Sequence, residues 1–230
     1  AHEAAEARRQ LGIVPQDLAL YPLLTAEENL LAFGAQHGVP KKDLRDRAKW
    51  ALEWTGLGDR AKSLSKTFSG GMKRRLNIAC AMLHQPKVVL FDEPTVGVDP
   101  QSRERIWAML GELRSQGAAL LLTTHQLDEA QQICDRITSI DHGKAIADGT
   151  MDQLVAGTIG RGRRVTLILD RPVSNGLASG GQPSADGTSI AFTVEDMAAE
   201  LPALIQRFAA AHCRVEDVQI ERPSLHAVFI

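Results

Sequence analysis

Short apolar segments alternate along this chain with longer stretches of helical periodicity. Segments suited to strands stand at Leu11–Val14, Val88–Phe91, Ala119–Thr123 and Ile137–Ile140, and the stretches between them place apolar residues three or four positions apart. Parallel strands need such a crossover between them, whereas antiparallel strands can be joined by a tight turn. The pattern therefore predicts a layered α/β domain with a largely parallel sheet.

Helices are predicted wherever apolar residues recur at helical spacing, which is the case at Asp43–Trp54, Gly71–Leu83, Ser102–Ser115 and Leu127–Cys134. A helical insert after the first strand begins at Thr25 and Glu28, a pair with capping-box spacing. Thr150 and Gln153 have the same spacing and predict the start of another helix.

The alternation of apolar strand patterns and helical patterns ends after Gly157. The stretch GTIGRGRR suits a linker, and the pattern beyond it predicts strands at Val165–Leu169 and Ile190–Val194, a helix at Met197–Ala211, and strands around Val218 and Val228. We expect one α/β domain over residues 1–158, with a helical subdomain at about 25–84, and a small α+β domain over residues 159–230.

The composition limits the possible partners and compartments. The chain has 230 residues, a net charge of −2 and a pI near 6.4, so it has no long-range attraction for nucleic acid and none is expected as a partner. Its three cysteines, Cys80, Cys134 and Cys213, are odd in number and widely spaced, which is typical of a reducing compartment. No stretch approaches the ~20 apolar residues of a membrane helix, and we expect a cytoplasmic protein.

Two acidic residues follow the apolar segment VVLF. Asp92 and Glu93 would stand at the carboxyl end of a strand, the edge at which open α/β sheets bind ligands. Asp92 has the chemistry to hold Mg²⁺ through water, and Glu93 to orient or deprotonate a water that attacks a phosphoryl group. A strand end followed by a solvated acidic turn explains the same residues, and this segment alone leaves both interpretations open.

A turn of small residues precedes one of the predicted helices and consists of Ser69, Gly70, Gly71 and Met72. Glycines let the main chain approach an anion, a serine can donate a hydrogen bond, and the first helix amides carry the positive end of the dipole. An ordinary glycine-rich N-cap is the alternative and the commoner use of such a turn. The three bases that follow, residues 73–75, are more often a solvated helix face than a ligand site.

Further polar residues stand just past two of the predicted strands. His125 follows the strand at 119–123, which places an imidazole on the same sheet edge as Asp92, where it could contact a terminal phosphate. Gln16 follows the first strand, and its amide could reach Mg²⁺ or the attacking water. The apolar loop after it, LALYPLL at residues 18–24, suits either a docking surface or a small core under the helical insert.

Taken in order, five short motifs resemble those of the ABC ATPase family: VPQ at Gln16, FSGGM at Ser69, LFDEP at Glu93, GVDP at Asp99 and TTH at His125. The resemblance covers nearly everything before residue 158 and implies an ABC ATPase core of the P-loop NTPase type. It also implies roles: Gln16 in the Q-loop, residues 69–72 as the signature, Asp92 and Glu93 as the Walker B pair, Asp99 in the D-loop and His125 as the switch histidine. The segments SGGMKRRL and DEPTVGVDP are most similar to the drug-export branch, that of the daunorubicin-resistance ATPases.

One motif of the family, the phosphate-binding loop G-x-x-x-x-G-K-[ST], does not occur in this sequence. In the family it precedes the residue that matches Gln16, so we expect the chain to be truncated at its front. We expect the complete protein to hydrolyse ATP with Mg²⁺, and this chain alone to be inactive. Loss of the front strands would also leave a sheet edge unpaired and the chain prone to aggregation.

The resemblance implies that two such domains face each other head to tail, with each ATP between the phosphate loop of one and the signature of the other. The implied partners are a second ATPase domain and multi-span membrane subunits, which would place the protein on the inner face of the cell membrane, and the implied function is export. Two rival functions are a soluble ABC-type ATPase that acts outside transport, and a non-enzymatic binding module. The single signature disfavours the first, and the presence of Glu93 and His125 disfavours the second.

Overall fold

The computed structural model describes residues 2–158, 162–173 and 177–221. Backbone contacts divide the chain into two compact units, Ala1–His125 and Gln126–Ile230. The domain boundary predicted near residue 158 lies inside the second of these units and stays a prediction.

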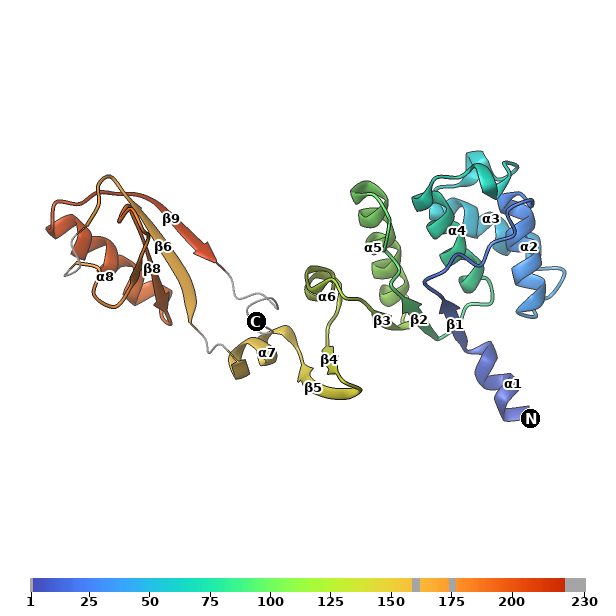
Figure 1. Ribbon diagram of the computed structural model, residues 1–230. Coiled ribbons are helices and arrows are strands. Elements are labelled where there is room, and N and C mark those ends of the chain that lie inside the picture. Colours follow the sequence, from blue (N-terminus) through green and yellow to red (C-terminus); the bar gives the residue numbers. More distant parts are fainter. Residues whose placement is uncertain (1, 159–161, 174–176, 222–230) are drawn as a thin grey trace. The chain divides into compact units, whose positions relative to one another are not determined.

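A parallel three-stranded sheet forms the centre of the first unit, with β2 between β1 and β3 (Figure 1). The strands are β1 at Leu11–Val14, β2 at Val88–Asp92 and β3 at Ala119–Thr123, so the three strands predicted in this part of the chain are confirmed. A helix, α1 at His2–Arg9, leads into β1. In the sheet register Asp92 stands beside Thr123, which brings the ends of β2 and β3 together.

The two faces of this sheet are covered differently. Val14, Val89 and Phe91 are buried on the face that meets α4, which runs from Gly70 to Met82. Successive residues of a strand point to opposite faces. On the open face Ile13, Leu90 and Leu121 therefore form a row across the strands, and Ile13 and Leu121 are 57% and 62% exposed.

Three helices of the first unit form the predicted helical insert, namely α2 (Ala26–Gln36), α3 (Leu44–Thr55) and α4, with short 3₁₀ helices at Gly58–Arg60 and Ser65–Thr67. The predicted capping box is confirmed, because the Glu28 amide donates to the Thr25 hydroxyl at 3.2 Å and the Thr25 amide donates to the Glu28 carboxylate at 2.8 Å. These helices bury a common apolar core, which includes Leu30, Leu52, Leu76 and Leu83. After the insert, α5 covers Pro100–Ser115 and leads into β3.

The apolar loop at residues 18–24 is partly packed against the helical insert and partly exposed. Leu20 packs against the core of the helical insert. Leu18, Tyr21 and Leu23 are 43%, 51% and 71% exposed. The main chain of the loop is held by Asn29, whose Oδ1 accepts from the Tyr21 amide at 2.8 Å. The loop is thus anchored by one apolar side chain and presents three others.

The second unit begins with α6 (Leu127–Ile133) and a two-stranded antiparallel hairpin of β4 (Ile137–Asp141) and β5 (Lys144–Gly149). The strand predicted at Ile137–Ile140 is confirmed, but it pairs with β5, a strand that the sequence analysis did not predict, and not with the parallel sheet. Helix α7, Met151–Thr158, follows with its predicted cap, since the Gln153 amide donates to the Thr150 hydroxyl.

A four-stranded antiparallel sheet in the order β7-β8-β6-β9 completes the second unit. Its elements are β6 (Arg163–Leu169), β7 (Gln182–Pro183), β8 (Ser189–Val194), α8 (Met197–Ala210) and β9 (Val215–Glu221). Alternate residues of β6 and β8 pack with Phe208 of α8 in a separate core, including Val165, Leu167, Ile190 and Phe192. The predicted α+β character is confirmed, while the strand predicted around Val228 lies outside the described residues.

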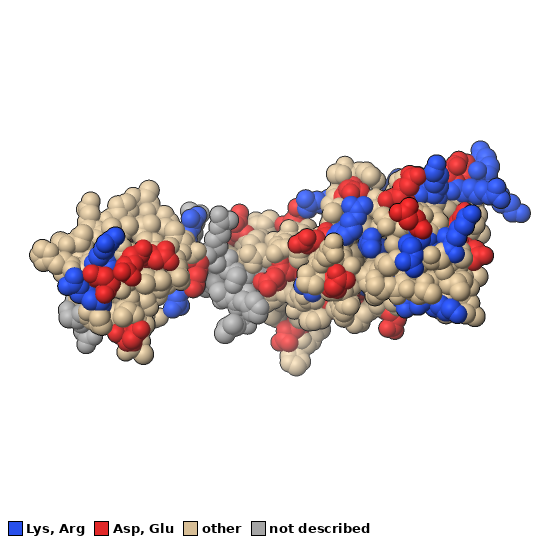
Figure 2. Space-filling model, turned by 90° about the horizontal axis from the view of Figure 1, so that it is seen from above, with Lys and Arg blue, Asp and Glu red and all other residues tan. Residues whose placement is uncertain are grey.

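Charges of both signs are interspersed over the surface that Figure 2 shows. Within the described parts of the chain, every helix is too short or too polar to cross a bilayer. The three cysteines carry free thiols; Cys80 and Cys213 are buried and Cys134 is half-buried.

Candidate functional site

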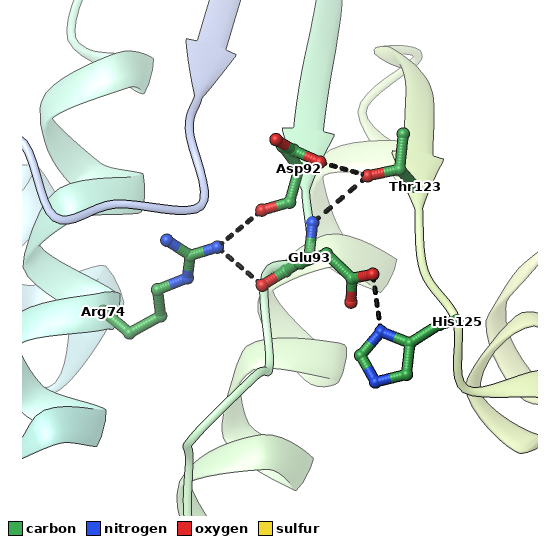
Figure 3. A network of polar contacts seen from close by, with 5 residues as sticks. All are labelled: Arg74, Asp92, Glu93, Thr123 and His125. Atoms are coloured by element: carbon green, nitrogen blue, oxygen red, sulfur yellow. Dashed lines mark hydrogen bonds and ion pairs between the residues drawn. The ribbon is translucent and has the colours of Figure 1, made fainter.

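Asp92 occupies the carboxyl end of the central strand. Because β2 pairs with β3 at this point, the Thr123 hydroxyl reaches Asp92 and donates a 2.5 Å hydrogen bond to Oδ1 (Figure 3). A carboxylate oriented in this way suits Mg²⁺, which takes oxygen ligands and keeps several waters. Among the described residues, no group of three or more His, Cys, Asp or Glu side chains has the geometry to hold a metal ion by itself.

Glu93 follows directly and is in contact with His125. Its Oε1 lies 2.6 Å from Nδ1 of His125, and its amide donates to the Thr123 carbonyl at 3.1 Å. The Glu93 side chain is 17% exposed and that of His125 is 70% exposed. The structure therefore brings the predicted acid and the predicted histidine into direct contact, whereas the sequence predicted only that the two lie on the same sheet edge.

The second carboxylate oxygen of Glu93 has different surroundings. Oε2 is buried and has no hydrogen-bond partner among the described residues. Burying an unpaired acceptor is unfavourable, and unpaired groups of this kind are rare in folded proteins. Glu93 also has a φ of 47°, a left-handed conformation that costs a non-glycine residue of the order of 1 kcal/mol. Both features are typical of functional sites.

Arg74 connects this turn to the rest of the fold. Its guanidinium donates to the carbonyl oxygens of Asp92 and Glu93, both at 2.8 Å (Figure 3). It also donates to the carbonyls of Pro94 at 2.7 Å, Pro15 at 2.7 Å and Gln16 at 3.0 Å. Burial lowers the pKa of Arg74, and the nearby Asp92 carboxylate opposes that shift.

The expectation that residues 73–75 form a solvated face is wrong for Arg74, which is only 3% exposed. Its neighbour Arg75 is half-buried and donates to the Thr55 carbonyl at 2.5 Å. Arg74 is the residue of the site that sequence reasoning missed. The available signal was its spacing from Gly71 and Ile78, which puts it on the buried side of α4.

The start of α4 has the geometry of a helix cap. Ser69 is the N-cap residue, and its hydroxyl accepts from the Met72 amide at 3.2 Å. Gly70 is exposed and open, with Gly97 O as the nearest atom to a Cβ built there, at 3.7 Å. A Cβ on Gly71 would instead lie 2.1 Å from Oγ of Ser102. The space beside Gly71 is thus used by the protein itself, and a phosphate contact at these residues stays a prediction.

Asp99 is held by its side chain and Gln16 by its main chain. Asp99 is the N-cap of α5, where its Oδ1 accepts from the Ser102 amide at 2.9 Å. The hydrogen bonds from Ser102 and, more weakly, the charge of Arg75 hold the pKa of Asp99 below its usual range. Gln16 is exposed just past β1, and Arg74 ties its carbonyl to the turn at Glu93.

Known proteins resemble this chain in sequence. The family model described as ABC transporter matches residues 1–96. The linearmycin resistance ATP-binding protein LnrL of Bacillus subtilis is 47% identical over 152 residues, which are 66% of this chain and 49% of that protein. The daunorubicin resistance ATP-binding protein DrrA3 of Streptomyces coeruleorubidus is 35% identical over 99% of this chain and 73% of that protein.

Solved structures resemble the chain as well. The ATP-binding subunit of an ABC transporter superposes with a TM-score of 0.60 at 31% identity, over 68% of this chain and 65% of that chain. The ATP-binding cassette MJ0796, dimeric and bound to ADP and Pi, gives 0.58 at 27% identity, over 65% of this chain and 66% of that chain. The chain belongs to the family of ATP-binding proteins of ABC transporters.

Proposed function

We propose that this chain forms the hydrolytic half of an ATP site, and that the complete protein hydrolyses ATP to drive export through separate membrane subunits. The observation that carries the proposal is the 2.6 Å contact of Glu93 with His125, next to Asp92 at the end of the central strand. An acid, a carboxylate suited to Mg²⁺ and an imidazole at one sheet edge are groups that can serve phosphoryl transfer to water.

Glu93 would act on the attacking water. His125 engages Oε1, so the carboxylate is held in one orientation at the strand end. As the water attacks the terminal phosphoryl group, the Glu93 carboxylate would take its proton, the bond between the γ-phosphorus and the bridging oxygen would break, and ADP would leave. The exposed ring of His125 would contact the same phosphate.

Asp92 and Gln16 would hold the Mg²⁺ ion that accompanies ATP. When bound, Mg²⁺ neutralises charge on the phosphate oxygens. Asp92 offers a carboxylate whose orientation Thr123 sets. Gln16 stands at the end of β1, and its main chain is fixed to the same turn through Arg74. Oxygen ligands from two loops leave room for the waters that Mg²⁺ keeps.

The start of α4 would bind the ATP held by a second copy of the chain. A phosphate group would suit Ser69, the open Gly70 and the first amides of α4. The Asp99 side chain lies beside Gly71, close to these groups. A solved relative is described as dimeric and bound to ADP and Pi, which supports a homodimer of ATPase domains with ATP and ADP as ligands.

Relatives named for linearmycin resistance, daunorubicin resistance and Nod factor export support an export function. The exposed side chains of Leu18, Tyr21 and Leu23 would contact the membrane subunits and keep the protein on the inner face of the cell membrane. We expect a tagged complete protein to co-purify with a multi-span membrane protein, and Leu23→Asp to weaken that association. Purification without such a partner would favour an ATPase that acts outside transport.

The test of hydrolysis is Glu93→Gln in the complete protein. The amide cannot take a proton from water, so steady-state phosphate release should fall by about 10²-fold or more while ATP binding is kept. Glu104→Gln is the matched control, because Glu104 is an exposed residue of α5 away from the strand ends, and it should turn over like the wild type. Wild-type turnover in Glu93→Gln would remove Glu93 as the base.

The 230-residue chain itself should bind ATP weakly, because its sequence holds no G-x-x-x-x-G-K-[ST] loop to surround the phosphates. Titration calorimetry measures this directly. A dissociation constant of about 1 µM for the chain would contradict the expectation.

A further inference from the structure

Arg74 is a buried cation whose donors are all used on main-chain carbonyls. A guanidinium has five N–H groups. Nε bonds Pro94, Nη1 bonds Pro15 and Gln16, and Nη2 bonds Asp92 and Glu93. The five donors of Arg74 therefore meet five carbonyl oxygens from two separate segments of the chain.

These carbonyls lie where the strands end. Residues 15–16 follow β1 and residues 93–94 follow β2, so the sheet ladder no longer supplies donors for them. Taking a guanidinium out of water is unfavourable unless every donor is satisfied, and charge-assisted bonds to carbonyls provide that compensation. Lysine has three donors on a single atom and cannot reproduce the pattern.

The bonds to Asp92 and Glu93 have a specific consequence for Glu93. Its φ and ψ angles are the rotations between the peptide plane before it, which carries the Asp92 carbonyl, and the plane after it, which carries its own carbonyl. Nη2 of Arg74 holds both oxygens at 2.8 Å. Arg74 thereby fixes both peptide planes around Glu93, whose backbone φ of 47° is unfavourable for a residue other than glycine.

We propose that Arg74 is a positioning residue, which holds the turn at Glu93 in its left-handed conformation so that the Glu93 carboxylate stays against His125. The same guanidinium holds Pro15 and Gln16, so it also fixes the distance between the Gln16 loop and this turn. The proposal rests on the proposed role of Glu93 in hydrolysis. Without Arg74 the turn relaxes, Oε1 leaves Nδ1 of His125, and the carboxylate no longer meets the attacking water.

The test compares Arg74→Lys and Arg74→Gln with Arg105→Gln in the complete protein. Arg105 is the control because its Nη2 also donates to a main-chain carbonyl, that of Trp54 at 2.6 Å, in a part of the fold away from Glu93. We expect kcat to fall by about 10²-fold in both Arg74 variants, because a small misplacement of a catalytic group is enough for such a loss. The KM for ATP should stay within about twofold of the wild type, and Arg105→Gln should keep its kcat.

A second readout does not depend on turnover. In protein with labelled histidines, NMR signals of the His125 ring report whether Glu93 is in contact with it, and Glu93→Gln provides the reference for a lost carboxylate. The His125 signals in both Arg74 variants should move toward those of Glu93→Gln, and in Arg105→Gln they should stay as in the wild type. His125→Asn assigns these signals among the seven histidines of the chain.

The outcomes separate this proposal from the proposed function. If Glu93→Gln leaves turnover unchanged, the hydrolytic role of Glu93 fails, whatever Arg74 does. If Glu93→Gln stops turnover while folded Arg74→Lys keeps both kcat and the His125 signals of the wild type, the positioning role alone is overturned. If both Arg74 variants fail to fold and Arg105→Gln folds, Arg74 serves the fold as a whole, and the positioning role is likewise overturned.

Discussion

Substitution by alanine should destabilise the fold at Gly71 but not at its neighbour Gly70, both of which stand at the start of α4. A Cβ on Gly71 would lie 2.1 Å from Oγ and 2.5 Å from Cβ of Ser102, and 3.2 Å from Oδ2 of Asp99. The Oγ can rotate away, but the Ser102 Cβ is fixed to the first turn of α5, so α4 and α5 must separate. Overpacking of this kind costs about 1–3 kcal/mol, which is the destabilisation we expect for Gly71→Ala.

Gly70→Ala is the matched control. The nearest atom to its Cβ would be 3.7 Å away, an ordinary contact, so its stability should stay within about 0.5 kcal/mol of the wild type. Gly71→Ala combined with Ser102→Gly should recover most of the loss, apart from the 0.5–1 kcal/mol that a glycine in a helix costs, roughly. Ser102→Ala should rescue less, because it keeps the Cβ.

Urea unfolding followed by tryptophan fluorescence measures these differences in the 230-residue chain. Trp50, Trp54 and Trp107 all lie in the first unit, so the signal reports the unit that contains α4 and α5. A Gly71→Ala variant as stable as the wild type, or a Gly70→Ala variant destabilised to the same extent, would rule out overpacking against Ser102.

Asp99→Ala should lose the N-cap of α5 and about 1 kcal/mol in urea unfolding, while Asp99→Asn keeps the bond to the Ser102 amide and most of the stability. Leu121→Thr should leave stability within about 0.5 kcal/mol and reduce light scattering by the chain, because Leu121 is 62% exposed on the open sheet face; equal scattering would argue against that face as the cause of association. The stacked rings of His37 and His84 have pKa values lowered by burial from the ordinary 6.5, and for His37 also by the charge of His84. Just below pH 6.5 the unfolded chain therefore binds more protons than the folded chain. The contribution of these histidines to the free energy of unfolding is fully present above pH 6.5 and is lost as the pH falls from 6.5 toward the lowered pKa values of the folded state. His37→Phe keeps a stacked ring and removes one titrating group, so its urea midpoint should change less between pH 7 and about pH 5.5; an unchanged pH dependence would contradict this account.

Much of the fold could be predicted because its signals are local. The Thr25–Glu28 pair lies within one helical turn, and its spacing alone indicates the start of α2. The apolar run ending at Phe91 indicates a buried strand, and acids after such a run fall at the sheet edge. Gln16, Asp92, Glu93 and His125 were predicted at that edge by the same reasoning.

Other features could not be predicted because they depend on partners distant in the sequence. The strand at Ile137–Asp141 carries the apolar pattern that suits a parallel sheet, yet it pairs with β5 across a two-residue turn. Nothing in the pattern of one strand states which neighbour it will pair with. In the same way, a glycine at position 71 indicates a close approach but does not tell whether a ligand or Ser102 makes it.

Most helices and strands, their order and the chemistry available at the strand ends follow from local sequence, because periodicity, capping and residue type act over a few neighbouring positions. Which of these groups contact one another depends on the folded chain. Glu93 meets His125 from 32 positions away, and Arg74 meets Gln16 from 58 positions away. Arg74 bonds main-chain carbonyls because it is buried, whereas an arginine on the exposed face of a helix would be solvated by water.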